Sequence, residues 1–443
     1  MKQYLDLLND VMTNGTDKEP SRQGMPGTRQ LFGRQFSIDL KDGFPLYTTK
    51  KLSFKNIVNE LNWFLKGHTS VKFLEYYKCR IWHDDSYVNY TRVANEVLQQ
   101  ANLIQQMSHG SDEPLINMFT WQCSLTVLES NMFKRTKIEA TKDNVLDCYE
   151  LLSKEEYKKM IRNWGDSIHR KSVIDNHFDL DKEVVNNKII KFTNHVDSKN
   201  LQYSSTLFDS CIEIATSYKY HSYDIGDCGA QYGYLWRNLK AVESDGITVK
   251  TVDQVGDLIS SLTDTPFSRR HIIDSWNPGT IDEMALHACH PIVQWDVTEK
   301  EGKRYLSCSF YMRSNDLFLG NPYNIAFYAL LTNLLAHAYK MGLGTLTWSC
   351  GDAHIYSNHF DSVKEQLSRT PMKLPNLNLP KDMGFFLLQD LITPSVKNLS
   401  SRTENQFGHQ IYVGLDNYLE QITNSLENYN PYESIKGELS TGA

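Results

Sequence analysis

The sequence lacks any long apolar run. No stretch of its 443 residues approaches the roughly 18–20 consecutive apolar positions that span a bilayer. Its first residues, MKQYLDLLNDVMTNG, also lack the apolar stretch of a signal peptide, because Asp6 and Asp10 interrupt them. We therefore expect a protein with no membrane partner, located in the cytoplasm.

Cysteines with metal-ligand spacing are missing as well. No C-x-x-C motif or zinc-like cluster occurs, so we expect no bound metal. The eight cysteines are Cys79, Cys123, Cys148, Cys211, Cys228, Cys289, Cys308 and Cys350. In a large chain without an export signal they are expected to be reduced. Most should fill the core, and any one is a candidate nucleophile.

A surplus of positive charge is absent too. The 46 Lys and Arg residues stand against 53 Asp and Glu, which gives a formal net charge of −7 at pH 7. Binding along a nucleic-acid backbone needs clustered Lys and Arg. We therefore expect no nucleic-acid partner, although a small phosphate pocket is compatible with this charge.

The residue patterns that are present divide the chain into three parts. Residues 1–83 and 223–443 alternate strand-like segments such as HPIVQWDV with helical ones such as SFKNIVNELNWFLKG. Residues 84–222 are rich in Lys, Asp, Asn and Glu, a composition typical of solvated helix faces. We predict an α/β (α+β) domain formed by the two outer parts, with a large mixed, twisted β-sheet flanked by helices. The middle part is predicted to be an inserted, mostly helical subdomain.

Cys289 is the first candidate for chemistry. It stands in MALHACHPIVQW, between a predicted loop and a strand, and beside His290. A thiolate is a strong nucleophile when nearby cations lower its pKa. The alternative is a small buried residue that only precedes a strand.

Arginines provide the cations. Adjacent Arg269 and Arg270 in TPFSRRHII can form a forked site for an anion such as phosphate. Arg313 is followed by the hydroxyl of Ser314, and Arg22 lies in a glycine-rich loop. Arginines together with a thiol indicate an anionic substrate that is attacked by sulfur. Solvated turns explain the same arginines, and their spacing does not by itself bring them together.

Two polar residues lie within apolar helices. Glu60 in NELNWFL stands at the edge of the apolar face, where a partly buried carboxylate usually has a partner or a role. The amide of Asn324 both donates and accepts hydrogen bonds, which suits reading the edge of a base. The alternatives are a Glu that faces water and an amide that caps a helix or is satisfied in the core. Tyr232, His354 and Tyr356 carry no signal of their own.

Taken in chain order, these segments resemble the thymidylate synthase family. The matching motifs cover nearly all of residues 1–83 and 223–436, and their number and order make the resemblance specific. They are FPLYTTKK, NELNWFLKG, IW at 81–82, QYGYLWR, SRRHII, WN at 276–277, MAL-x-x-CH, RSND-x-x-LGNPYNIAFYALL and GDAHIYSNH. The resemblance implies the thymidylate synthase fold, a pyrimidine deoxynucleotide substrate and 5,10-methylenetetrahydrofolate as the one-carbon donor.

The resemblance also implies a role for each candidate at the nucleotide. Cys289 would attack C6 of the pyrimidine, Glu60 would organise proton transfers at the base and Tyr232 would help to remove the C5 proton. The implied nucleotide ligands are Arg22, Arg313 and Ser314 at the 5′-phosphate, His354 and Tyr356 at the ribose 3′-hydroxyl, and Asn324 at the base.

Folate binding and dimerisation are implied in the same way. Asp316 stands with the catalytic residues and is implied to bind the pterin. The other implied folate contacts are Ile81, Trp82, Leu286 and Tyr323. Arg269 and Arg270 are implied to reach the phosphate of the partner subunit's site, so a homodimer is expected.

Asn324 decides which base is expected. An amide can pair with the O4 and N3–H edge of uracil. The cytosine-specific hydroxymethylase branch resembles this region but carries Asp at that position. We therefore expect dUMP rather than dCMP as the substrate.

Several departures from the family pattern predict that water, rather than a hydride, completes the reaction. Ala288 replaces the usual Pro, Met312 replaces the usual Gln as in a viral dCMP hydroxymethylase, and His83 replaces an acidic residue. The chain ends in the polar GELSTGA where synthases close the site with an apolar residue, so a leaky lid is expected. The expected reaction is hydroxymethylation of dUMP, as in a bacteriophage that modifies its DNA. Reductive methylation to dTMP is the alternative, which the synthase-like Cys289-His290 pair favours.

A catalytically inactive family member that binds a partner or regulates RNA is a further alternative. The presence of Cys289, Arg313, Asn324 and Glu60 argues against it. The role of the predicted insert stays open. The three alternatives are that it covers the site, that it binds a replication partner, and that it only adds bulk.

Overall fold

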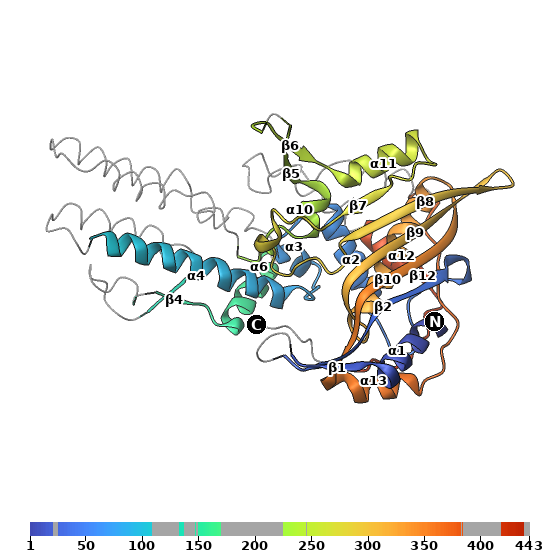
Figure 1. The fold of residues 1–443 in the computed structure, drawn as a ribbon, viewed down its shortest axis with the longest axis horizontal. Helices are drawn as coiled ribbons and strands as arrows, with labels where there is room; N and C mark the ends of the chain where they lie inside the picture. The colour runs from blue at the N-terminus through green and yellow to red at the C-terminus, as the bar shows by residue number, and fades with distance from the viewer. Residues whose placement is uncertain are drawn as a thin grey trace. The chain divides into compact units, whose positions relative to one another are not determined.

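The computed structural model describes residues 1–20, 25–108, 133–136, 147, 149–169, 225–244, 246–381, 383 and 418–437. The chain divides into two compact units. One consists of Met1–Thr69 with Ala230–Ala443, and the other of Ser70–Gly229 (Figure 1). In the described part of the chain, no helix is both long and apolar enough to cross a membrane.

A six-stranded mixed sheet organises the first unit. Its strands, in spatial order, are β1 (Thr16–Lys18), β2 (Thr28–Asp39), β10 (Gly342–Tyr356), β9 (Lys303–Asp316), β8 (Ile292–Lys300) and β7 (Ile272–Asp274). Strands β9 and β10 run parallel, and the other neighbouring strands are antiparallel. The expected mixed sheet flanked by helices is therefore confirmed.

Helices α12 (Gly320–Ala338) and α2 (Phe54–Leu65) carry much of the core of this unit. Most residues of α12 are buried, and the helix packs on β9 and β10 (Figure 1). Helix α2 begins where Ser53 Oγ accepts a hydrogen bond from Asn56 N at 3.3 Å. Its predicted apolar face is buried, so the helix is anchored where it carries Glu60.

Shorter elements complete the first unit. They are α1 (Lys2–Asn14), η1 (Leu40–Asp42), α10 (Tyr232–Arg237), β5 (Leu239–Val242), β6 (Val249–Val252), α11 (Gln254–Asp264), η3 (Ile281–Glu283), η4 (Ser357–His359), α13 (Phe360–Leu367), β11 (Asn376–Leu377) and β12 (Leu426–Glu427). Helices α1 and α13 pack on each other, and α1 also packs on β2.

The second unit contains the described part of the predicted insert. Its elements are α3 (Val71–Tyr76), α4 (His83–Ser108), β3 (Phe133–Arg135), β4 (Tyr149–Leu151) and α6 (Lys154–His169). The rings of Tyr90 and Tyr157 pack at 5.0 Å in its core. The unit also takes in residues 70–83 and 225–229, and much of the predicted insert lies outside the described residues. The insert at 84–222 therefore remains a prediction.

An ion pair ties three elements of the first unit together. Arg237 at the end of α10 is 3% exposed and its Nε lies 2.7 Å from Oδ1 of Asp253, the residue that caps α11. Its Nη1 donates to the carbonyl of Leu65 at the end of α2, at 2.7 Å. The Arg237 guanidinium therefore links the end of α2 to the start of α11 through the Leu65 carbonyl and the Asp253 carboxylate.

We predict that Arg237→Leu lowers the free energy of unfolding by about 2–3 kcal/mol, because the Leu65 carbonyl loses its bond from Nη1 and Asp253 loses its charged partner. Arg304→Leu is the matched control. Arg304 forms an exposed pair with Glu299 at 3.5 Å, so its loss should cost less than about 1 kcal/mol. Urea unfolding measures both, and equal effects would contradict the assignment.

Candidate active site

Two hydrogen bonds hold the loop that carries Cys289. The backbone N–H of Cys289 donates to the hydroxyl of Tyr232 at 2.7 Å. Its backbone carbonyl accepts from the N–H of Arg313 at 2.9 Å. The preceding turn is fixed because Nε2 of Gln231 donates to the Leu286 carbonyl at 2.8 Å. The half-buried Cys289 thiol is thus set on a rigid backbone between α10 and β9.

Arg313 places a permanent positive charge beside this thiol. Its Nη2 lies 3.8 Å from Cys289 Sγ. Its Nε and Nη2 also donate to the carbonyls of Ala288 and His287, at 2.9 and 2.8 Å. A neighbouring guanidinium favours the thiolate over the thiol. The structure therefore brings together the two residues that the sequence pairs as nucleophile and anion ligand.

Buried aromatic rings pack next to the loop that carries Cys289. The rings of Tyr232 and His290 stack at 4.1 Å with an angle of 3°, and Phe64 of α2 stacks on Tyr232 at 4.7 Å. Burial lowers the pKa of His290 to about 3, so the imidazole is neutral near pH 7. Its Nδ1 lies 2.6 Å from the hydroxyl of Tyr328.

Burial also controls the two tyrosines. Burial first, and then the charge of Cys289, raise the pKa of Tyr232 well above its ordinary value. The pKa of Tyr328 is raised by burial, then by Tyr232 and Cys308, and finally by Glu60. Both phenols therefore stay protonated, and half-buried Glu60 lies within electrostatic range of this group.

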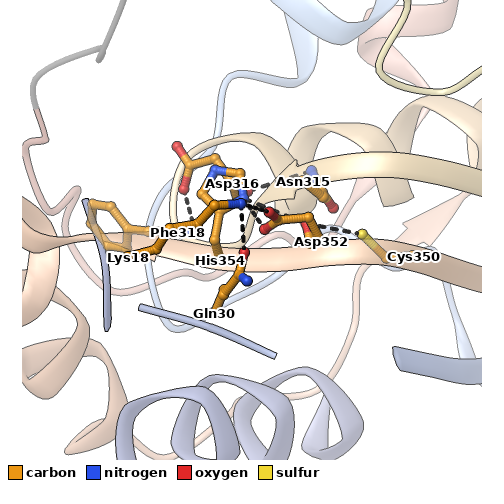
Figure 2. Close-up of polar contacts among 8 residues, drawn as sticks. All are labelled: Lys18, Gln30, Asn315, Asp316, Phe318, Cys350, Asp352 and His354. Atoms are coloured by element: carbon orange, nitrogen blue, oxygen red, sulfur yellow. Dashed lines mark hydrogen bonds and ion pairs between the residues drawn. The ribbon is translucent and has the colours of Figure 1, made fainter. Parts of the chain in front are cut away.

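A second polar cluster forms at the ends of β9 and β10. His354 Nδ1 lies 3.0 Å from Oδ1 of Asp352, and Lys18 Nζ lies 3.4 Å from Oδ2 of the same carboxylate (Figure 2). The Gln30 amide faces this carboxylate with its nitrogen, at 2.5 and 3.0 Å, because an amide oxygen there would meet only acceptors. Burial works to raise the pKa of Asp352, but hydrogen bonds and charge from His354 and Lys18 outweigh it and lower the pKa.

The nucleotide candidates Ser314, Asn324 and Tyr356 also lie in this unit. Ser314 pairs with Asp352 across β9 and β10, and Tyr356 presents its ring edge-on to His354 at 5.0 Å. Asn324 is half-buried near the start of α12.

The expected pterin ligand Asp316 is held at the end of β9. Its Oδ1 accepts from the backbone N–H groups of Phe318 and Leu319, at 2.9 and 3.2 Å. The carboxylate therefore has a fixed orientation, with Oδ2 as its second acceptor. Leu286 and Tyr323, the other folate candidates of this unit, are both half-buried, and Tyr323 accepts a hydrogen bond from Ser53 N.

Lys50 is a residue that the sequence did not single out. It is 3% exposed, it donates to the carbonyl of Phe318, and its Nζ lies 3.8 Å from the Phe318 ring centre. Burial lowers its pKa to about 7, against the opposing charge of Asp316. Lys50 lies within the motif FPLYTTKK, but only its depth in the fold separates it from the exposed Lys51.

The remaining candidates are Arg269, Arg270, Ile81, Trp82 and Arg22. Arg269 and Arg270 lie in the loop between α11 and β7 with exposed side chains. Ile81 and Trp82 belong to the second unit. Arg22 lies outside the described residues. Among the residues that the structure does describe, no group of three or more His, Cys, Asp or Glu side chains is placed to hold a metal ion.

The departures that favoured hydroxymethylation have ordinary surroundings. Ala288 is fully buried and its carbonyl accepts from Arg313, while Met312 is 1% exposed in the core. His83 belongs to the second unit, where its Nε2 lies 3.2 Å from the buried carboxylate of Glu75. Residues 438–443, which include nearly all of the polar tail, lie outside the described residues.

Comparison with known proteins places this arrangement in a family. A family model described as thymidylate synthase matches residues 2–393. The chain is 34% identical over 380 residues to the thymidylate synthase of Listeria monocytogenes serotype 4b (strain CLIP80459), covering 86% of this chain and 90% of the relative. It is 33% identical over 379 residues to the thymidylate synthase of Listeria innocua serovar 6a, with the same coverage. These names favour reductive methylation over the hydroxymethylation that the sequence led us to expect.

We predict that iodoacetamide alkylates Cys289 in the native protein at least about tenfold faster than the four buried cysteines, because only a reachable thiolate reacts. Those four are Cys79, Cys228, Cys308 and Cys350. Peptide mapping by mass spectrometry measures the rates. Arg313→Gln should slow the reaction at Cys289, and a rate indifferent to this change would show that the guanidinium does not activate the thiol.

Proposed function

This chain belongs to the thymidylate synthase family, and we propose that it methylates C5 of dUMP to give dTMP. The observation that carries the proposal is the Cys289 thiol beside the Arg313 guanidinium, on a loop that Tyr232 fixes. The family uses 5,10-methylenetetrahydrofolate as its one-carbon donor. Bound folate would supply both the carbon and the hydride that makes the new group a methyl.

The nucleophile and its anion site support the first step. The Cys289 thiolate adds to C6 of the uracil, so that an S–C6 bond forms and the electron pair of the C5–C6 double bond moves to C5 and O4. Arg313 stabilises the thiolate before attack. Because its Nε and Nη2 bind backbone carbonyls, Nη1 remains to bind the 5′-phosphate, with Ser314 beside it and with Arg22.

The contacts of Tyr232 with the Cys289 loop support the proton transfers. The Tyr232 oxygen accepts N–H bonds from Cys289 and His290, which hold this hydroxyl beside the nucleophile, and its O–H would donate in a proton relay. Since its pKa is raised, Tyr232 acts as a relay and not as a phenolate base. Glu60 is the ionisable group on α2 suited to exchange protons with the O4 side of the base.

The residues around Asp316 fit a folate. Backbone N–H groups hold Oδ1, so Oδ2 can accept from an N–H of a pterin ring. The half-buried Leu286 and Tyr323 would contact the ring. The folate roles of Ile81 and Trp82 stay predictions from the sequence resemblance. His354 and Tyr356 would bind the ribose 3′-hydroxyl.

A homodimer is part of the proposal, and an exposed sheet face supports it. Phe32 is 75%, Ile292 41% and Tyr311 40% exposed, on three strands of the sheet. Ile292 and Tyr311 are direct cross-strand partners, and a Cβ added at Gly351 would lie 2.9 Å from Tyr311 and 3.5 Å from Phe32. These three side chains therefore form one apolar patch, which a second copy of the chain would cover.

Product analysis tests the reaction. We predict that the protein with dUMP and 5,10-methylenetetrahydrofolate yields dTMP and one dihydrofolate per turnover, identified by mass and by dihydrofolate absorbance. Cys289→Ala should abolish turnover while dUMP binding persists, because the nucleophile alone is removed. Hydroxymethyl-dUMP without dihydrofolate would instead establish water capture, and turnover by Cys289→Ala would exclude the covalent mechanism.

Subunit mixing tests the dimer. Cys289→Ala and Arg270→Ala should each lack activity alone. After mixing and reassociation, activity should return to about a quarter of the sites, because half of the dimers then pair an intact Cys289 with a partner's intact Arg270. Tyr311→Glu should yield monomers in sedimentation, whereas Ile247→Glu, at an exposed position outside the patch, should not. No recovery on mixing would mean that Arg270 acts within its own subunit.

A further inference from the structure

A buried hydrogen-bond network ends at the residue expected to read the base. We call Asn315, Asn321, Asn324 and Trp348 the amide network. Asn315 is 3% exposed, and Asn321 and Trp348 are fully buried. Nδ2 of Asn315 donates to Oδ1 of Asn324 at 3.0 Å. Oδ1 of Asn315 accepts from Nδ2 of Asn321 at 2.9 Å and from Nε1 of Trp348 at 3.2 Å.

Trp348 gives this network one direction. An indole N–H donates and never accepts, so Asn315 must turn its oxygen toward Trp348. A flipped Asn315 would set its NH₂ group against the N–H groups of both Trp348 and Asn321. Because the oxygen is fixed, Nδ2 of Asn315 must face Asn324. Asn324 must then present Oδ1 to Asn315, which leaves Nδ2 as the amide atom available to a base.

The backbone leaves little room for another arrangement at this bond. A Cβ added at Gly320 would lie 3.3 Å from Asn315 Nδ2 and 3.5 Å from Asn324 Oδ1. Gly320 at the start of α12 therefore packs directly against the bond between the two amides. The depth of Asn315 also keeps water from replacing Asn324 as its acceptor.

We propose that Asn315 is a positioning residue that makes the site select a 4-oxo over a 4-amino pyrimidine. By holding Oδ1 of Asn324, it turns Nδ2 of Asn324 toward position 4 of the base. Uracil presents an acceptor there, its O4, while cytosine presents an amino donor. Nδ2 therefore binds uracil and opposes cytosine. The inference rests on the proposed function, since it concerns how that nucleotide site chooses its base.

Asn315→Asp tests the proposal with nearly the same shape. The carboxylate still accepts from Trp348 and Asn321, but it no longer donates to Asn324. Asn324 should then turn its NH₂ group to the carboxylate and its oxygen to the base, which favours a 4-amino group. We expect the ratio of dUMP to dCMP affinity to fall by about tenfold or more, and to fall further as rising pH ionises the new carboxyl. Equilibrium titration of each nucleotide by calorimetry gives the ratio.

A second variant and a control separate positioning from folding. Asn315→Ala removes the donor without adding charge, so the amide of Asn324 can adopt either orientation and the ratio should again fall. Asn333→Asp is the matched control. Asn333 lies on α12, the helix that carries Asn324, and its buried amide donates to the Ala329 carbonyl at 2.8 Å, away from the network. A structural defect alone lowers the bound fraction for both nucleotides alike and leaves their ratio unchanged.

Each outcome decides one question. A lowered ratio in Asn315→Asp or Asn315→Ala, with an unchanged ratio in Asn333→Asp, supports the positioning role. An unchanged ratio in every Asn315 variant that folds and binds dUMP overturns it. Failure of the unaltered protein to bind dUMP at all would overturn the proposed function instead.

Discussion

The relative positions of Cys289, Arg313 and His354 depend on the pairing register of β9. On one side, the parallel pairing with β10 sets His354 opposite Asp316. On the other side, the antiparallel pairing with β8 continues into the bond from Arg313 N to Cys289 O, at 2.9 Å. A slip of one residue in β9 would turn its side chains, Arg313 and Asp316 among them, to the opposite face of the sheet. The nucleophile, the anion ligand and the ribose ligand therefore share one structural cause.

Burial then determines which groups carry charge. His290 is neutral because burial lowers its pKa to about 3, and Tyr232 remains a phenol because burial raises its pKa. Beside the nucleophile, the charged side chain is the half-buried Arg313. The neutral side chains of His290 and Tyr232 are buried, whereas the charged Arg313 is half-buried. This arrangement suits an anionic nucleotide whose base is buried and whose phosphate stays near water. It also limits proton exchange to a few fixed oxygen atoms.

Much of this fold could be predicted because its signals are local. The alternation in HPIVQWDV and the largely apolar composition of α12 follow from which face each segment buries. The amide network could not be predicted, since Trp348 lies 33 residues from Asn315 and no periodicity reveals a partner at that distance. Ala288 and Met312 are departures from the family pattern that favour water capture. Both side chains are buried, and the Ala288 carbonyl binds Arg313. Replacing the usual Pro by Ala288 therefore says little about access of water to the site.

The roles of Arg269 and Arg270 stay predictions because a partner subunit would complete them.

An amide that reads a base faces an ambiguity that shape cannot resolve. Its oxygen and nitrogen are nearly identical in size, so a pocket that fits one orientation of Asn324 also fits the other. Only a partner that donates without accepting, or accepts without donating, can break this symmetry, and it must be buried so that water does not compensate. Trp348 meets both conditions, being fully buried and bonded to Asn315. Because Trp348 lies on β10, the strand pairing that sets the ribose ligand His354 opposite β9 also fixes the direction in which the base is read.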